Sequence, residues 1–572
     1  MYQIKKILCS PQKYFLTSTN YGFIMASINQ IFPILLLIGL FSSCTTNTQV
    51  DLIVFNAKIY TVDSTFTTAE AFAVKNGVFI DIGTSEVILK RYKAKETIDA
   101  KENPIYPGFY DAHAHFFMFA ELLDQADLTG ATSVGEVIEK LKIYHLSHPE
   151  KKWIVGAGWD QNLWSDKVFP TKDSLDKYFP DIPVYLSRID YHAAWVNSKA
   201  LEIARLDSGR TVDGGLIMLD SLGYPAGILV DNATSLISIH IPEEAEIDLL
   251  QSLRRAQDSL FSVGLTSIVD AGLNSDQLEI LTKFYSQDSL KIRDYAMILA
   301  EPYDIGNYIR QGVYDSDRLS IKSVKLMADG ALGSRGACLL EHYHDHPSKG
   351  FLLRSPAEFD ETIRLLSDSP FQVNTHAIGD SANRLILDAY GRHLTDGKKR
   401  RWRIEHAQVI APEDFKKFSK FHIIPSIQPT HATSDMYWAE ERLGAERIKG
   451  AYAYKQLLQQ YGLVALGSDF PVEHFNPLYG FHAAVARVDK TGFPGGGFQM
   501  ENALTREEAL RGMTIWAAFS CFQEQKRGSI EKGKDADFVI LEDDIMSAPD
   551  NQLRDIKTLR TVIAGETVFL RQ

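Results

Sequence analysis

Cysteine is scarce in this sequence. Its 572 residues include four cysteines, Cys9, Cys44, Cys338 and Cys521, and no two of them form a CxxC pair. This spacing excludes a disulfide-stabilised scaffold and a zinc finger held by thiolates. Any bound metal ion must therefore be held by histidine, carboxylate or lysine side chains.

An excess of basic charge is also missing. The chain has 60 lysines and arginines against 73 aspartates and glutamates, which gives a formal net charge of −13. A nucleic-acid partner is disfavoured, because no basic excess exists to displace counterions from phosphates. The hydrophobic content of 45% and charged content of 23% are typical of a folded globular protein, and the length suffices for more than one domain.

An apolar run of the roughly 20 residues that cross a bilayer is missing as well. The N-terminal run IFPILLLIGLF, residues 31–41, has eleven residues, the length of a signal-peptide core. It leads into LFSSC, which resembles a bacterial lipobox, with Phe41 where a smaller aliphatic residue is usual. We predict that residues 1–44 form a lipoprotein-type signal peptide, with Met1 or Met25 as the start, and that Cys44 is lipidated. The protein is then expected on the periplasmic or outer-membrane face of the bacterial cell envelope.

Strand-like segments lie at both ends of the remaining chain. Residues 45–104 contain two β-rich runs, and an Asn76-Gly77 pair predicts a hairpin in the second. Residues 526–572 contain two more, GSIEKGKDADFVILEDD and LRTVIAGETVFLRQ. We predict that the two terminal segments build one small β-sandwich domain, with residues 105–525 inserted as a unit.

The middle of the chain alternates strand-like and helix-like segments. The first of eight candidate strands ends at His113 and His115, and the others occupy residues 183–192, 264–272, 323–330, 371–380, 401–408, 421–431 and 462–471. Eight strands with intervening helices predict an α/β fold, a (β/α)8 TIM-like barrel. The long gap after the first strand predicts an insertion at about residues 125–262.

Two histidines alternate in the stretch PGFYDAHAH, residues 107–115. In a strand, positions i and i+2 point to the same face, so His113 and His115 project side by side, together with Asp111. Two converging neutral imidazoles suit a metal ion. Taken alone, the pair fits equally well on the exposed face of a surface strand.

Further polar residues end other predicted strands. Lys325, His376, His406 and Asp469 each stand near the end of one of them. Each has an ordinary explanation: a satisfied buried histidine, a helix N-cap or a lysine reaching to solvent. Because the strand ends of a barrel converge on its catalytic face, the joint pattern favours a metal centre there.

His-x-His followed by Lys, His, His and Asp in this order resembles the amidohydrolase superfamily. The segments SVKLMADGALGSRG, NTHAIGD, SRIDYHAAWVNSKAL and AAFSCFQEQKRGSIEKGKDADFVIL resemble the amidohydrolase-3 branch, which includes N-substituted formamide deformylase. The likeness covers about residues 50–572, and family members usually have glycine where Tyr191 stands.

The resemblance implies a divalent metal cofactor, zinc, as one or two ions. It assigns His113 and His115 to the more buried ion and His376 and His406 to the second. Lys325 would bridge both as an N-carboxylysine, because a carbamate anion, unlike an ammonium, is compatible with two cations. Asp469 would bind metal and shuttle a proton from water to the leaving nitrogen. The expected reaction is hydrolysis of a non-peptide carbon–nitrogen bond in a small amide or formamide-like substrate, by a monomer or a homodimer.

Weaker candidates for substrate contacts are His192, Asp329, Arg335 and Trp159. His192 ends the second predicted strand, and Asp329 and Arg335 follow the strand of Lys325. Core packing is the alternative for His192 and Trp159, and capping is the alternative for the other two. Two other functions remain open: a barrel lyase with Lys325 as a Schiff-base nucleophile, and a surface lipoprotein that binds a solute without catalysis.

Overall fold

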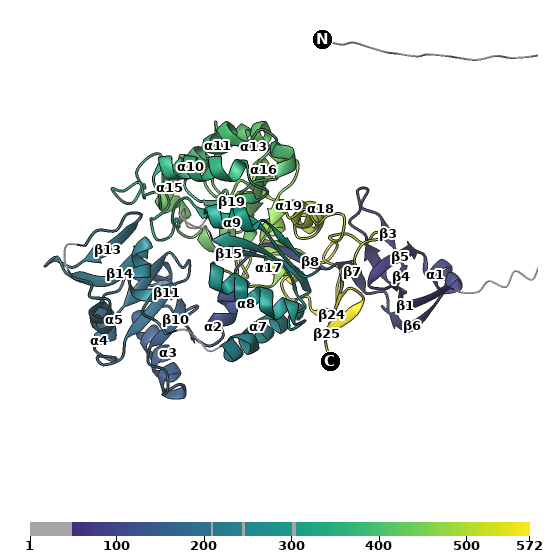
Figure 1. Cartoon of the computed structure of the whole chain (residues 1–572), viewed down its shortest axis with the longest axis horizontal. Coiled ribbons are helices and arrows are strands. Elements are labelled where there is room, and N and C mark those ends of the chain that lie inside the picture. The colour runs from purple at the N-terminus through teal and green to yellow at the C-terminus, as the bar shows by residue number, and fades with distance from the viewer. Residues whose placement is uncertain (1–47, 208–209, 243–245, 300–304) are drawn as a thin grey trace, which may run out of the picture. The chain divides into compact units, whose positions relative to one another are not determined.

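Eight parallel strands form the central barrel of the protein (Figure 1). The computed structural model describes residues 48–572, apart from 208–209, 243–245 and 300–304. In chain order the barrel strands are β8 (Phe109–Ala114), β15 (Leu265–Leu273), β16 (Arg293–Leu299), β18 (Leu319–Met327), β19 (Gln372–Ala377), β20 (Arg403–His406), β21 (Ile424–Ile427) and β22 (Ala465–Leu466). The sheet closes after β22, where the Asp469 N–H donates to the His113 carbonyl at 2.7 Å.

Helices cover the outside of this barrel (Figure 1). They include α7 (Glu246–Phe261), α8 (Ser275–Ser286), α10 (Pro356–Ser367), α11 (Asp380–His393), α13 (Phe415–Phe421) and α16 (Tyr454–Tyr461). Two begin at capping boxes that the sequence encodes, Asn274 with Gln277 and Ser355 with Glu358. Their apolar faces pack on the strands, so the core holds the carboxyl ends of the strands in place.

A second sheet is inserted after the first barrel strand. Its order is β13-β14-β12-β11-β10-β9, and its strands are β9 (Ala126–Asp127), β10 (Ile154–Trp159), β11 (Val184–Arg188), β12 (Ala193–Val196), β13 (Gly215–Leu219) and β14 (Pro225–Asp231). The placement of residues 183–192 in the barrel was therefore wrong. A short turn joins β11 to antiparallel β12, whereas a parallel barrel strand needs a long crossover. Its place is taken by β16, which the sequence pattern missed because it opens with the charged pair Arg293 and Asp294.

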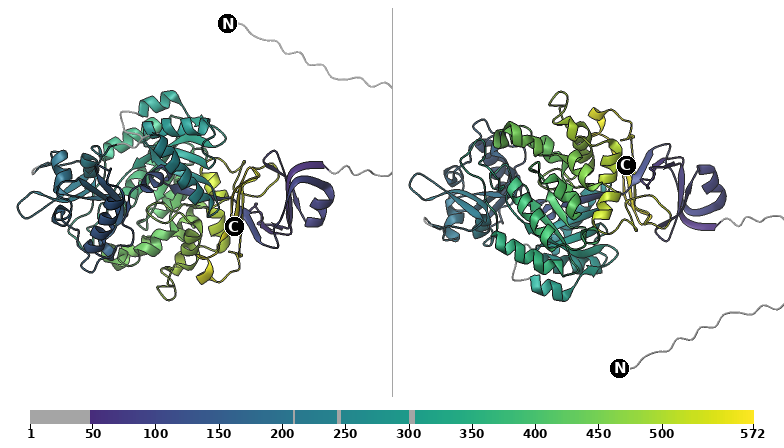
Figure 2. Two further views of the ribbon diagram at one scale, coloured as in Figure 1. Left: turned by 90° about the horizontal axis from the view of Figure 1, so that it is seen from below. Right: turned by 90° about the horizontal axis from the view of Figure 1, so that it is seen from above.

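The two chain ends share the remaining sheets, in the orders β5-β4-β1-β6 and β25-β24-β23-β7-β2-β3. Their strands are β1 (Thr48–Phe55), β2 (Lys58–Tyr60), β3 (Thr68–Ala69), β4 (Ala71–Lys75), β5 (Val78–Gly83), β6 (Tyr92–Asp99), β7 (Pro104–Pro107), β23 (Phe538–Leu541), β24 (Thr558–Ile563) and β25 (Glu566–Leu570). Phe72, Phe79 and Phe538 pack between the sheets. Figure 2 shows the purple N-terminal and yellow C-terminal strands side by side in both views. The predicted barrel with a β-sandwich from both termini and an insertion is thus confirmed.

Charged groups connect this terminal sandwich to the barrel and to itself. Arg293, at the start of β16, binds Asp537 twice, with Nε–Oδ2 at 2.8 Å and Nη2–Oδ1 at 3.1 Å. Asp544 accepts from Lys58 Nζ at 2.7 Å and from the hydroxyl of Tyr106 at 2.8 Å. We call these two groups the terminal joint. In both groups the carboxylate binds a partner from a distant part of the chain.

The lipid-anchor prediction concerns a part of the chain that is not described. Cys44 and the apolar run at 31–41 lie outside the described residues. Among the residues that are described, no helix has the length and apolar character needed to cross a bilayer.

Candidate metal centre

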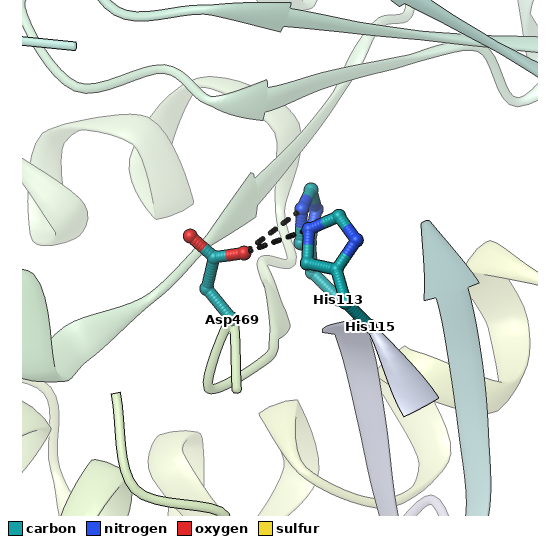
Figure 3. Close-up of side chains that lie close together, drawn as sticks. All are labelled: His113, His115 and Asp469. Carbon is teal, nitrogen blue, oxygen red and sulfur yellow. Dashed lines mark ion pairs between the residues drawn. The ribbon is translucent and has the colours of Figure 1, made fainter. Parts of the chain in front are cut away.

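The carboxyl ends of the barrel strands bring the predicted ligands together. His113 is the last residue but one of β8, and Asp469 lies in the turn that follows β22. Figure 3 shows both histidines directed at the carboxylate of Asp469. Asp469 Oδ1 lies 3.4 Å from Nε2 of His113 and 3.2 Å from Nε2 of His115. These three side chains form a first cluster in which one donor atom from each lies within 4.8 Å of the others.

A second cluster shares the same carboxylate. His406, His431 and Asp469 are all buried, and they also place one donor atom each within 4.8 Å of the others. Asp469 Oδ2 lies 3.2 Å from His431 Nε2. His431 is near the start of α14 (Pro429–Asp435), directly after β21. Sequence reasoning did not select it, although it is the last residue of the seventh predicted strand.

His376 lies beside this second cluster. Its ring centroid is 4.5 Å from that of His406. Within the described chain, His376 Nε2 and His406 Nδ1 are buried and have no hydrogen-bond partner. Burial lowers the pKa of both histidines well below its ordinary value, so both imidazoles are neutral. Buried, neutral and unpaired nitrogens fit a divalent metal ion.

Lys325 lies in β18, two residues before that strand ends, and its side chain reaches His113. Its side chain is 2% exposed, and Nζ lies 3.3 Å from Nε2 of His113. Burial lowers the pKa of Lys325 to about 8. Lys325 therefore lies beside His113 Nε2, in the position where the family resemblance places a bridging group.

A buried carboxylate orients His113. Glu405 Oε2 accepts a hydrogen bond from His113 Nδ1 at 2.5 Å, and Arg403 Nε donates to Glu405 Oε1 at 2.6 Å. Although burial acts in the opposite direction, Arg403 and His113 hold the pKa of Glu405 well below its usual range. Burial lowers the pKa of His113 to about 4. The proton on Nδ1 leaves the lone pair of Nε2 directed at the centre, as in metal-bound histidines. Glu405 was missed from sequence, and its position next to His406 was the available signal.

Comparison with known proteins identifies the family. A model of the amidohydrolase family matches residues 96–569. The chain belongs to the amidohydrolase family. YtcJ of Bacillus subtilis (strain 168), which carries the name of an amidohydrolase, is 32% identical over 527 residues, 89% of this chain and 98% of its own. The N-substituted formamide deformylase of Arthrobacter pascens is 26% identical over 552 residues, covering 90% and 97% of the two chains.

The solved structures agree with this assignment. A metal-dependent hydrolase from Pyrococcus horikoshii OT3 superposes with a TM-score of 0.71 at 27% identity, covering 87% of this chain and 99% of that one. The resemblance to the branch that includes N-substituted formamide deformylase is confirmed. This amidohydrolase is accordingly a metal-dependent hydrolase on a TIM barrel.

Three weaker candidates make contacts within the protein, and their role toward a substrate stays a prediction. Asp329 accepts from the backbone N–H groups of Ile378 and Gly379, at 3.0 and 2.8 Å, and so fixes the loop after His376. Arg335 is paired with Asp345 at 2.8 Å. Trp159 is fully buried in the inserted sheet, where its indole donates to the Leu186 carbonyl at 2.8 Å. No surface of Trp159 is left for a substrate.

The shared carboxylate of Asp469 lies on a strained turn that neighbouring hydrogen bonds hold in place. Asp469 has φ +64, a left-handed conformation that costs about 1 kcal/mol or more for a residue with a side chain. Asp111 accepts from the Ser468 hydroxyl at 2.6 Å and from the backbone N–H groups of Ser468 and His113. Asp111 therefore ties the last strand to the first and is not free to act as a ligand. Although burial acts in the opposite direction, hydrogen bonds from His115 and His431 keep the pKa of Asp469 well below its ordinary value.

Proposed function

We propose that the protein hydrolyses a non-peptide carbon–nitrogen bond in a small amide or formamide-like molecule, using one or two divalent ions, most simply zinc. One observation carries this proposal. The two oxygens of Asp469 face two histidine clusters, at 3.2 Å from His115 and 3.2 Å from His431. An amine is a poor leaving group unless it is protonated, so such a hydrolase needs one carboxylate that takes a proton from water and returns it to nitrogen.

The donors suggest a ligand set. His113 and His115 would hold one ion, and His376 and His406 would hold the second. Lys325, whose Nζ lies 3.3 Å from His113 Nε2, would serve as the bridging carbamate. A free ammonium there would repel a cation by about 4 kcal/mol per unit-charge pair at 4 Å and an effective dielectric of about 20. A bound ion supplies a water whose pKa falls from about 15.7 to about 7, and it polarises the substrate carbonyl.

The chain's own residues then divide the work. Asp469 accepts the proton of the attacking water and later donates it to the leaving nitrogen. His431 holds Asp469 Oδ2 in place, and Glu405 holds His113 in the tautomer that presents Nε2. The 26% identity to the Arthrobacter deformylase supports a formamide-like substrate as one member of the accepted class.

The decisive experiment is a screen of N-formyl, N-acyl and cyclic amides against the zinc-loaded full chain. We expect turnover that a chelator abolishes and zinc restores. Asp469→Asn should reduce kcat by about 1,000-fold or more, roughly 4 kcal/mol, whereas the matched control Asp276→Asn, on the exposed start of α8, should not. Turnover that survives chelation, with covalent trapping of Lys325 by borohydride, would instead establish the Schiff-base lyase.

The proposed location is a lipid anchor at Cys44 on the periplasmic or outer-membrane face of the cell envelope. The apolar run at 31–41 followed by SSC supports it. Mass spectrometry of the membrane fraction should find a lipidated N-terminus at Cys44. A protein recovered with an intact residue 1 in the cytoplasm contradicts this proposal. The homodimer stays a prediction, and sedimentation of the purified chain tests it.

A further inference from the structure

The inserted sheet presents a histidine to the metal centre. His192 lies in the turn between β11 and β12, and its ring centroid is 5.2 Å from that of His376. Its side chain is 15% exposed. The insertion therefore reaches the ring of barrel histidines directly.

A buried arginine fixes the turn that carries His192. Arg188 is 2% exposed, and it donates to Gln161 Oε1 at 2.7 Å and to Asp190 Oδ2 at 2.5 Å, and also binds Asp160. The other oxygen of Asp190 accepts from the backbone N–H of His192 at 3.1 Å. Burying an arginine with two carboxylates gives little net stability. The arrangement instead holds the His192 backbone in one position, as a functional side chain requires.

A second carboxylate orients the ring. Asp231, at the end of β14, accepts from His192 Nδ1 at 2.5 Å, and its side chain is fully buried. A Cβ added to either Gly330 or Gly336 would lie 2.4 Å from Asp231 Oδ2. The glycines of the loop after Lys325 therefore leave the space in which the carboxylate sits. Asp231 binds Nδ1 only, which leaves Nε2 of His192 for another partner.

A cavity of about 950 Å³ reaches Asp231, the partner of His192. Lys325 and Asp231 both line it, together with the apolar Met327 and Leu352 and the polar Ser355. Ligand pockets commonly measure about 300–1,000 Å³. The space therefore admits a substrate group larger than a formyl hydrogen, between the bridging lysine and the Asp231 carboxylate.

We propose that His192, held by Asp231, is a further catalytic residue that hydrogen-bonds the acyl side of the substrate, and that the cavity holds the acyl substituent. This inference rests on the proposed function. The ring centroids follow one another as His115, His113, His406, His376 and His192, at 5.5, 4.9, 4.5 and 5.2 Å. Asp469 lies against the part of this row from His115 to His406, and His192 lies beyond His376 at the other end. A substrate whose leaving nitrogen meets Asp469 consequently directs its acyl side to His192.

The test compares zinc-loaded full-chain variants His192→Ala, His192→Asn and Asp231→Asn with the wild type. His240→Asn is the matched control, because His240 is an exposed histidine of the same insertion. Three quantities are measured: zinc content, the Kd for acetohydroxamate by calorimetry, and kcat/KM for the best amide of the screen. Melting temperatures establish that each variant is folded, and His192→Asn carries the test if His192→Ala is unstable.

We expect both His192 variants to retain zinc, while acetohydroxamate affinity and kcat/KM fall roughly 10- to 100-fold. Asp231→Asn should lower the same two quantities by a smaller factor, and His240→Asn should match the wild type. Loss of zinc from the His192 variants would make His192 a metal ligand and overturn the proposal, as would unchanged affinity and kcat/KM. A wild type that hydrolyses no amide, yet needs His192 for acetohydroxamate binding, contradicts the proposed function and leaves the His192 contact standing.

Discussion

Two regions of this amidohydrolase bury charged and polar groups, and they differ in how these groups are partnered. In the terminal joint, Arg293 meets both oxygens of Asp537. In the metal centre, His376 Nε2 and His406 Nδ1 are buried without a hydrogen-bond partner in the described chain. Arg293 and Asp537 are as deeply buried as these histidines, but only the ion pair is satisfied by protein atoms alone.

The difference separates stability from function. Removing one partner of a fully hydrogen-bonded buried ion pair strongly lowers the free energy of unfolding, because the other partner is left charged in the interior. Buried donor atoms that converge without partners are costly for the chain alone and acquire their partner from a ligand. Changes in the metal centre should therefore reduce metal binding and turnover, and changes in the joint should reduce the free energy of unfolding.

The largest effect is expected for Lys325→Ala. Under the proposed ligand set this variant lacks the bridging anion, so at least one metal equivalent and about 1,000-fold or more in activity should be lost, roughly 4 kcal/mol. Metal analysis and kcat/KM measure this. Acetate or propionate should partly restore both, whereas Lys325→Arg should stay inactive because its charge cannot be removed by carboxylation. A Lys325→Ala protein with two metals and normal turnover would contradict the bridging role of Lys325.

Arg293→Met tests the other region. Its removal leaves Asp537 buried without its principal partner, so the free energy of unfolding should fall by about 3–5 kcal/mol. Denaturant titration measures the change, with the exposed Arg392→Met as a control. Zinc content and kcat per folded molecule should not change. A loss of zinc at unaltered stability would break the distinction between the two regions.

Glu405→Gln should act on the metal centre through His113. Glutamine keeps the size of the side chain but not the charge that fixes the Nδ1–H tautomer, so zinc affinity should fall by about 10- to 100-fold. Competition with a chelator measures the affinity, and excess zinc should restore turnover. An unchanged affinity would show that the carboxylate serves Arg403 alone.

The smallest effect is expected for Asp544→Asn in the terminal joint. Although burial acts in the opposite direction, hydrogen bonds from Lys58 and Tyr106 lower the pKa of Asp544 from 3.8 to about 2. A lowered carboxyl pKa stabilises the fold above the unfolded value near 3.8, and this contribution is lost as the pH falls toward 2. At pH 7 the variant should lose about 1 kcal/mol, allowing for partial exposure. The difference from wild type should vanish near pH 2 in acid-unfolding curves, and a constant difference would contradict it.

The barrel and the ligands near its strand ends could be predicted from the sequence. A hydrophobic run marks each strand, and a polar residue that could bind metal comes at or near its end. His113, Lys325, His376 and Asp469 each follow a hydrophobic run, and parallel strands bring such endings to one face. The strand β16 was missed and β11 was misplaced, because local β character does not show which sheet a strand joins.

The partners of the ligands could not be predicted in the same way. Asp231 meets His192 across 39 positions, and Glu405 meets His113 across 292. Such contacts are set by tertiary packing and have no local periodicity. The same limit applies to Trp159, whose aromatic neighbourhood suggested a pocket but which packs against Trp164 and Trp195 in the inserted core.

The pairing of β7 with β23 has a consequence for biosynthesis. About 430 residues separate the two strands, and a ribosome adds roughly 5–20 residues per second, so β7 waits roughly 20 to 90 seconds for its neighbour. During that time its edge is open to pairing with other chains. We therefore expect a nascent chain of this protein to depend on a chaperone, or on export before folding. A barrel without a sheet shared by the two chain ends should depend on them less. Loss of the final 35 residues would leave β7 permanently unpaired on that side, and such truncated chains should aggregate rather than fold.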